Sequence, residues 1–266
     1  MVQSPGIVDE EDTDHSALFH KSERNMITVY DMGPSKFPVD VGASPHVRKI
    51  ILTLNYKSIP YEVKHLLFDE IESTAKSVGV SPTTVHPDGS AKYTIPFIHD
   101  SSTGKAVSDS FPCIEYIDQA YPDKPQVLPV GTRALQAVFI DSLQARTMAL
   151  VPLIAAKWPQ WYSMELLQSR KRLYPDAKPP PAPTPEQRTQ LWNALKGFVE
   201  GLNYGENEFL TGDKPNLVDF TLGSHLTTLW LLLGEDSEEW KDASGWNNGR
   251  AGRLVEKLLG YKRVSA

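Results

Sequence analysis

The sequence predicts an α/β domain over residues 26–122, followed by an all-α domain over residues 131–266. Short β-rich stretches alternate with helical patterns in the first range, and helical periodicity dominates the second. Between them, residues 122–129 carry three prolines in eight positions, which is typical of a linker. A chain of 266 residues is long enough to bury the cores of one or two domains.

Elements of the α/β domain follow in a clear order. Residues 26–31 are β-rich and predict a buried strand, and a loop rich in Gly and Pro follows over residues 33–43. A helix is then predicted because four apolar residues recur at helical spacing, namely Val47, Ile50, Ile51 and Leu54. Ser44 can cap this helix, and Pro45 suits its first position.

The sequence of the rest of this domain predicts three further strands and two helices. We expect a strand over residues 61–68, a helix over 69–80, a loop over 81–92 and a strand over 93–98. Pro96 interrupts that last strand, and a strand that contains proline needs a special reason because proline cannot donate to the sheet. A turn at 101–104, a short strand at 105–107 and a helix over 109–121 complete the domain.

The second half predicts long helices. Apolar residues that would line one long amphipathic helix are Leu135, Val138, Phe139, Leu143, Leu150 and Ile154. Residues 175–185 hold six prolines in eleven positions and predict a polyproline linker. Further helices are expected over 185–209 and 216–233, the second opened by a capping box of Asn216 and Asp219. We assign that box to folding rather than to chemistry.

Composition excludes several function classes. The net charge is −6, from 27 Lys plus Arg against 33 Asp plus Glu, so a nucleic-acid partner is not expected. No run of about 18 apolar residues occurs, so no membrane span is expected. The single cysteine, Cys113, excludes a disulfide framework and a Cys-rich zinc site, and it favours a reducing, cytoplasmic location. Residues 1–25 are acidic, lack the pattern of a secretory signal, and predict a disordered extension.

The order of elements resembles the glutathione transferase fold, a thioredoxin-like domain followed by an all-α domain. Ile95-Pro96 ahead of a strand and Asp109-Ser110 at a helix start carry this resemblance. Five segments resemble the fungal-specific class A of that family, which is itself similar to bacterial glutathione-dependent β-etherases. They are SPHVRK (44–49), LNYKSIPY (54–61), PDGS (87–90), VSDSF (107–111) and GEDSEEW (234–240). The likeness extends from Met26 to Tyr261 and implies glutathione as co-substrate, no metal, and a homodimer.

Ser44 is the residue that the resemblance makes catalytic. A hydroxyl at a helix start can donate a hydrogen bond to the sulfur of glutathione, and the positive end of the helix also favours the thiolate. The alternative is that Ser44 only caps the helix, as Ser-Pro ahead of an apolar helix does in many proteins. Ser35, in the same loop, could substitute for it.

Further residues are implied for binding glutathione. Pro96, if cis as in thioredoxin-like folds, would expose the backbone of Ile95 to the cysteinyl part of glutathione; otherwise it is an ordinary edge-strand proline. Asp109 and Ser110 would hold the γ-glutamyl end, unless Ser108 or Asp109 merely caps the helix. For the glycyl carboxylate we expect a cation, with Lys92 ahead of His86 and Lys64, although each could be an ordinary surface charge.

The electrophile is expected between the loop 34–43 and the long helix around Met148, with Phe37, Pro38, Met148 and Leu150 as walls. His46 and His225 have neither metal-binding spacing nor an evident carboxylate partner, and Cys113 fits a buried, inert thiol.

These expectations describe a serine-type glutathione transferase that conjugates or cleaves hydrophobic aromatic electrophiles. The alternative is a ligandin, a non-catalytic carrier of aromatic compounds on the same fold. A disulfide reductase or glutathione lyase is a third interpretation. The absence of a cysteine at position 44 counts against it, because serine cannot form a mixed disulfide.

Overall fold

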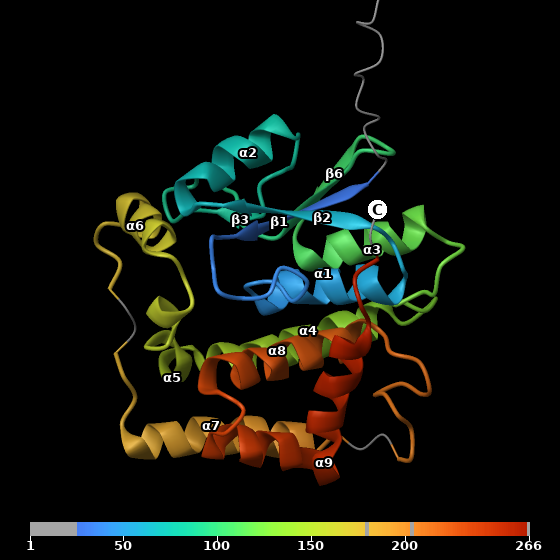
Figure 1. Cartoon of the computed structure of the whole chain (residues 1–266), viewed down its shortest axis with the longest axis vertical. Coiled ribbons are helices and arrows are strands. Elements are labelled where there is room, and N and C mark those ends of the chain that lie inside the picture. Colours follow the sequence, from blue (N-terminus) through green and yellow to red (C-terminus); the bar gives the residue numbers. More distant parts are fainter. Residues whose placement is uncertain (1–25, 179–180, 203–204, 265–266) are drawn as a thin grey trace, which may run out of the picture.

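The computed structural model describes residues 26–178, 181–202 and 205–264. The acidic extension predicted at residues 1–25 lies outside them. An α/β domain with a mixed sheet precedes a domain of helices (Figure 1). The predicted fold class is therefore confirmed.

A four-stranded sheet in the order β2-β1-β5-β6 organises the first domain. β1 (Ile27–Met32) pairs in parallel with β2 (Tyr61–Leu66), whereas β5 (Phe97–Asp100) is antiparallel to β1 and to β6 (Lys105–Ser108). The parallel step requires a crossover helix, which is α1 (Pro45–Tyr56). This topology brings the end of β1, the start of α1 and the start of β5 to one edge of the domain.

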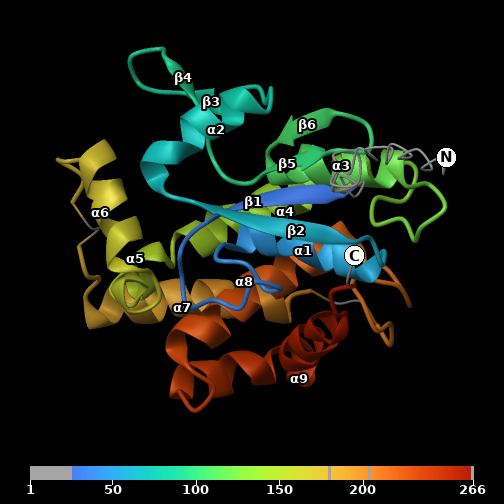
Figure 2. The same ribbon diagram turned by 45° about the horizontal axis from the view of Figure 1, so that its top comes forward.

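Helices cover both faces of the sheet. α1 and α3 (Ser110–Ala120) lie on the face toward the helical domain, and α2 (Ile71–Ser77), preceded by the 3₁₀ turn η2 (Phe68–Glu70), lies on the other (Figures 1 and 2). The core under α2 is small. The larger core is continuous from the sheet through α1 into the helical domain, so the start of α1 is held from both sides.

The second domain is built around α8 (Leu217–Leu233), which packs against α1, α4 and α9. Its other helices are α4 (Arg133–Met148), α5 (Val151–Ala155), η3 (Trp158–Gln160), α6 (Met164–Leu173), α7 (Pro185–Glu200) and α9 (Glu238–Gly260). The capping box of α8 is confirmed, because Asn216 Oδ1 accepts the N–H of Val218 and Asp219 accepts the N–H of Asn216, both at 3.0 Å. Within the described ranges, no single helix is long and apolar enough to cross a membrane, although the bent pair 133–148 and 151–160 meets those criteria together.

Several predicted boundaries in the α/β domain were wrong. The strand expected at 93–98 begins only at Phe97, since Pro96 has no N–H to donate to the sheet. The strand expected at 61–68 ends at Leu66. The loop expected at 81–92 contains a small hairpin of β3 (Thr84–Val85) and β4 (Ala91–Lys92).

Two predicted helices also differ. The long helix expected through Ile154 ends at Met148. The segment 151–160 that follows lies at 54° to it. Leu135 and Val138, which were expected on the apolar face of the long helix, are 74% and 69% exposed. The helix expected over 185–209 ends at Glu200. Apolar periodicity marks one face of a helix, but it does not distinguish a face against the core from a face on the surface.

Candidate functional site

A buried carboxylate fixes the loop that leads to Ser44. Asp31, at the end of β1, accepts the backbone N–H groups of Met32 and Ala43, each at 2.7 Å. The intervening loop turns at Gly42, where φ is +80°, a conformation that suits glycine. Burial raises the pKa of Asp31 to about 6, against the lowering effect of the two N–H groups and of Arg48.

Arg48 joins the same loop to the helical domain. Its guanidinium is fully buried and donates to the carbonyl oxygens of Val41 (3.1 Å) and Gly42 (3.0 Å). It also donates to the carbonyl of Ser224 and the hydroxyl of Thr228 on α8, both at 2.6 Å. Burial lowers its pKa to about 10, so the side chain remains charged at neutral pH. The position of Ser44 therefore depends on both domains.

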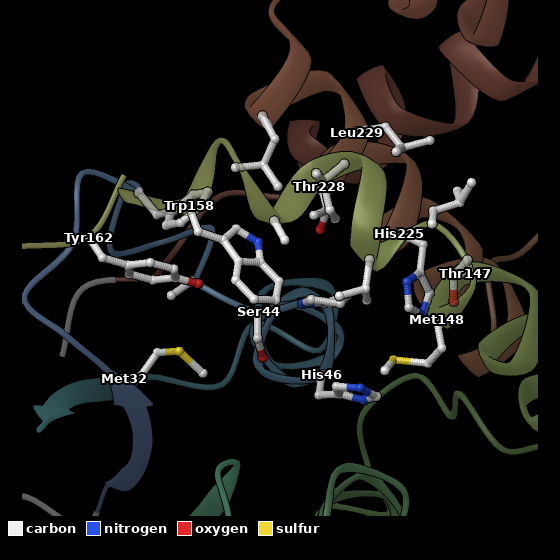
Figure 3. Close-up of a pocket in the computed structure, with 18 of the residues that line it drawn as sticks. Met32, Ser44, His46, Thr147, Met148, Trp158, Tyr162, His225, Thr228 and Leu229 are labelled. Atoms are coloured by element: carbon white, nitrogen blue, oxygen red, sulfur yellow. The ribbon is translucent and has the colours of Figure 1, made fainter. Parts of the chain in front are cut away.

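Ser44 is both a helix cap and a cavity residue. Its Oγ accepts the backbone N–H of Val47 at 3.1 Å, which confirms the predicted N-cap of α1. The side chain also lines a cavity between the two domains (Figure 3). An oxygen that accepts one hydrogen bond still holds a proton to donate. The capping role and the role of a donor to a ligand are therefore compatible.

The cavity has a volume of about 510 Å³ and mostly apolar walls. Three of the predicted wall residues, Phe37, Met148 and Leu150, line it. Pro38 does not: it is exposed, and its carbonyl accepts the N–H groups of Val41 and Gly42 in the turn. Other lining residues come from both domains and include Met32, Phe68, Leu143, Ile154, Trp158, Tyr162, Leu166, Leu226, Leu229 and Leu232.

The loop 33–43 is docked on the segment before α6. Backbone bonds run from Lys36 N–H to the carbonyl of Trp161 (2.7 Å) and from Ser163 N–H to the carbonyl of Pro34 (3.1 Å). The rings of Phe37 and Trp161 stack at 4.7 Å. Ser35 pairs through its backbone with Tyr162 and does not line the cavity, so the sequence alternative to Ser44 lies away from it.

The residues expected at the cysteinyl and γ-glutamyl parts of glutathione lie near the start of α1, where Asp109 is an electrostatic neighbour of His46 and Lys49. The Ile95–Pro96 peptide is cis, and the carbonyl of Pro96 accepts the N–H of Asp109 at 3.1 Å. Asp109 is the N-cap residue of α3 but makes no side-chain capping bond, and its φ is +68°. Ser110 is buried, and its hydroxyl donates to Asp109 at 3.2 Å. None of these residues lines the cavity.

The three cations expected for the glycyl carboxylate lie in other surroundings. Lys92 and His86 belong to the β3–β4 hairpin, and Lys64 on β2 is an exposed ion-pair partner of Glu62 at 3.1 Å. None of the three lines the cavity.

The structure brings together two histidines that are distant in sequence. The rings of His46 and His225 meet edge to face at 6.2 Å in the cavity wall (Figure 3). Burial, with Lys49 nearby, lowers the pKa of His46 to about 4, and burial together with His46, Lys49 and Arg48 lowers the pKa of His225. Both rings are therefore neutral at pH 7. Lys49 and Arg48, the nearby cations that disfavour protonation of these rings, also favour a negative charge beside Ser44.

Family models match both domains. The glutathione S-transferase N-terminal domain matches residues 39–125, and the C-terminal domain matches residues 134–261. The crystal structure of glutathione S-transferase CsGST63524 of Ceriporiopsis subvermispora, in complex with glutathione, is 31% identical with a TM-score of 0.78, covering 90% of this chain and 99% of that one. The chain belongs to the glutathione S-transferase family.

Two further fungal proteins are similar to this family member. Glutathione transferase GSTFuA3 of Phanerochaete chrysosporium is 26% identical, with a TM-score of 0.76 over 91% of this chain and 99% of that one. Glutathione S-transferase-like protein ustS of Aspergillus flavus is 27% identical over 86% of this chain and 88% of the relative. Membership of this family supports glutathione as the co-substrate.

The residues that the structure describes offer neither an evident metal site nor a reactive thiol. Among the described residues, no group of three His, Cys, Asp or Glu side chains could hold a metal ion. Cys113 is fully buried, as expected, and its thiol donates to the carbonyl of Val107 at 3.2 Å. Burial raises the pKa of this thiol, which keeps it protonated.

Sequence reasoning missed several residues of the site. Asp31, Arg48 and Tyr162 make contacts between segments that are distant along the chain. Arg170 joins the cavity wall from α6, far from Ser44 in the sequence. A charged residue inside an apolar helical pattern, as Arg48 is in α1, was the one signal available. It indicates a buried charge, but it does not name the partners.

Proposed function

We propose that this protein is a serine-type glutathione transferase that attacks hydrophobic aromatic electrophiles with a glutathione thiolate held beside Ser44. The observation that carries the proposal is the position of Ser44, which caps α1 and lines an apolar cavity at the same time. Resemblance to the fungal-specific class A supports this subtype, and its likeness to bacterial β-etherases extends the proposed reactions to ether cleavage.

Three features favour the thiolate. The Ser44 hydroxyl donates to sulfur, the first turn of α1 presents its positive end, and the buried cations Arg48 and Lys49 add positive potential. A bond from a neutral donor to a charged sulfur contributes about 1.5–3 kcal/mol. That corresponds to a drop of about one to two units in the pKa of the bound thiol.

The thiolate then forms a carbon–sulfur bond with the electrophile. In a substitution, the leaving group departs with the electron pair of the broken bond, and no oxidant or reductant is needed. Burial raises the pKa of Tyr162, so its hydroxyl stays protonated and can donate to the oxygen of a departing phenoxide. Trp158 and Phe37 supply aromatic walls for the substrate.

We also propose a homodimer in the cytoplasm. Exposed apolar side chains near the start of α4, at Val130, Leu135 and Val138, support a second copy as partner. The single, buried cysteine supports a reducing compartment.

The test separates the effect of the Ser44 hydroxyl on the thiolate from its effect as the helix cap. Glycine serves well as an N-cap residue and alanine does not, so Ser44→Gly keeps most of the helix stability while Ser44→Ala lowers it by about 1 kcal/mol. We expect both variants to raise the pKa of bound glutathione by about one to two units, measured by thiolate absorbance, and to lower kcat/KM with 1-chloro-2,4-dinitrobenzene by about tenfold or more.

Ser35→Ala is the matched control, since Ser35 lies in the same loop outside the cavity. It should leave the thiol pKa and kcat/KM unchanged. If Ser44→Gly binds glutathione with an unaltered thiol pKa, Ser44 does not stabilise the thiolate. Binding of aromatic compounds without any rate enhancement would instead support a ligandin.

A further inference from the structure

Arg170 is the one residue with a formal charge at neutral pH among the described residues that line the cavity. It lies in the last turn of α6 and is partly buried. The other lining residues are apolar, aromatic or uncharged polar, and the pKa values of His46 and His225 are lowered. A lone guanidinium in such a wall indicates an anionic ligand, because a charge beside apolar side chains is unfavourable unless an opposite charge pairs with it.

Arg170 has no ion-pair or hydrogen-bond partner for its side chain within the part of the chain that the structure describes. Its neighbour Arg172 differs, since Arg172 pairs with Asp69 at 2.7 Å. Lys171, between them, is exposed and does not line the cavity. Of these three consecutive cations on α6, only Arg170 lines the cavity. Its guanidinium is therefore the one that can pair with a ligand there.

α6 is held firmly against the first domain. Ser163 caps it by accepting the N–H of Leu166 at 3.1 Å, and the hydroxyl of Ser169 accepts the N–H of Phe68 at 3.0 Å. Ser163 also donates its own N–H to Pro34, in the loop that leads to Ser44. Arg170 therefore has a fixed relation to the site of the sulfur, as a residue that selects substrates requires.

We propose that Arg170 binds an anionic group, such as a carboxylate, on the electrophile. The preferred second substrate is then an aromatic or apolar molecule with one negative charge. This inference rests on the proposed function. The residues expected to hold glutathione, Ile95, Pro96, Asp109 and Ser110, lie outside the cavity wall, which leaves the cavity and Arg170 to the second substrate.

A matched pair of electrophiles tests the charge. Ethacrynic acid and its ethyl ester share one enone. The thiolate adds to the terminal carbon of the alkene, the π electrons pass to the carbonyl oxygen, and the α-carbon then takes a proton from water. We expect Arg170→Gln to lower kcat/KM for the acid by about tenfold or more and to change it less than about twofold for the ester.

Two variants complete the series. Arg170→Lys keeps the charge without the planar fork, so it should recover part of the preference for the acid. Lys171→Gln removes a neighbouring charge outside the cavity and should leave both electrophiles unaffected. Equal losses for acid and ester in Arg170→Gln, or no loss for either, would overturn the proposal.

The anion could also come from the glycyl end of glutathione. Repeating the assay with glutathione ethyl ester distinguishes the two sources. If Arg170 holds the glycyl carboxylate, wild type discriminates against glutathione ethyl ester, in which that carboxylate is blocked. Arg170→Gln then raises the KM for glutathione with either electrophile. That result contradicts the proposal. We expect the KM for glutathione to stay within about twofold.

A binding measurement separates failure of the inference from failure of the proposed function. The fluorescent probes 8-anilinonaphthalene-1-sulfonate and N-phenyl-1-naphthylamine share an aromatic skeleton, and only the first is charged. Arg170→Gln should weaken binding of the sulfonate by about tenfold and leave the neutral probe unchanged, even if no transferase activity is found. Parallel changes for both probes would show that Arg170 does not recognise the anion.

Discussion

The carboxylate of Asp31 accepts the backbone N–H of Ala43 at 2.7 Å, which ties the end of β1 to the residue directly before Ser44. Asp31→Ala removes the acceptor of the buried N–H of Ala43 and of the partly buried N–H of Met32, so we expect the free energy of unfolding to fall by about 2 kcal/mol. Because the loop then loses its anchor, kcat/KM should fall as well. Urea unfolding and the conjugation assay measure the two effects.

Asp40→Ala is the control for that change, since Asp40 is an exposed carboxylate of the same loop. It should alter stability by less than about 0.5 kcal/mol. If Asp31→Ala is destabilised but keeps the wild-type kcat/KM, Asp31 supports the fold without placing Ser44.

The raised pKa of Asp31 predicts a pH dependence of stability. Its pKa is about 6 in the folded chain against 3.8 in the unfolded one, so between roughly pH 4 and 6 the folded state keeps a proton that the unfolded state has released. The free energy of unfolding therefore falls as the pH rises through this window. Asp31→Asn cannot take up that proton, and the difference between wild type and variant should shrink by about 1–3 kcal/mol from pH 4 to pH 6.5.

Other acidic groups, including Asp219 with a pKa near 6, titrate in both proteins and cancel in this difference. Urea denaturation of the two proteins at matched pH values gives the comparison. A difference that stays flat or grows with pH contradicts the burial argument for Asp31.

Arg48 is predicted to be the costliest of these residues to replace. Its guanidinium makes four hydrogen bonds while fully buried, and they reach Val41 and Gly42 on one side and α8 on the other. Arg48→Met removes all four hydrogen bonds and leaves the carbonyl oxygens of Val41 and Gly42 without this donor, so we expect the free energy of unfolding to fall by about 3–5 kcal/mol. Arg48→Lys should recover little, because an ammonium cannot reproduce the fork.

Arg133 provides the matched comparison, since its ion pair with Glu115 is mostly exposed. Arg133→Ala should cost less than about 1 kcal/mol in urea unfolding. Comparable losses for Arg48→Met and Arg133→Ala would show that the buried network adds no more than a surface pair.

The sequence predicted the fold and part of the site because those features depend on neighbouring residues. Ser44 caps α1, and Asn216 with Asp219 caps α8, since capping is a contact within four residues. The expectation that Cys113 is buried follows from the apolar face of α3 in the same way.

What the sequence could not predict depends on residues far apart. Arg48 meets Ser224 across 176 positions, and the ring of His46 meets that of His225 across the domain boundary. The exposure of Leu135 depends on which surface of α4 faces α8. Local periodicity carries no information about these choices, because packing decides them.

Leu135 and Val138 are predicted to lie in the interface of the proposed dimer. They are exposed apolar residues three positions apart, so they share one face of α4. Leu135→Glu places a charge where a second copy would bury it, so light scattering coupled to size exclusion should show a monomer in place of a dimer. Since the residue is exposed within one chain, the folded monomer should keep its helical circular dichroism.

Met164→Glu is the control, because Met164 is as exposed as Val138 but lies on α6. This variant should remain dimeric. If wild type is already a monomer at micromolar concentrations, or if Leu135→Glu leaves the dimer intact, the exposed face of α4 is not the interface. Its apolar side chains would then need another partner.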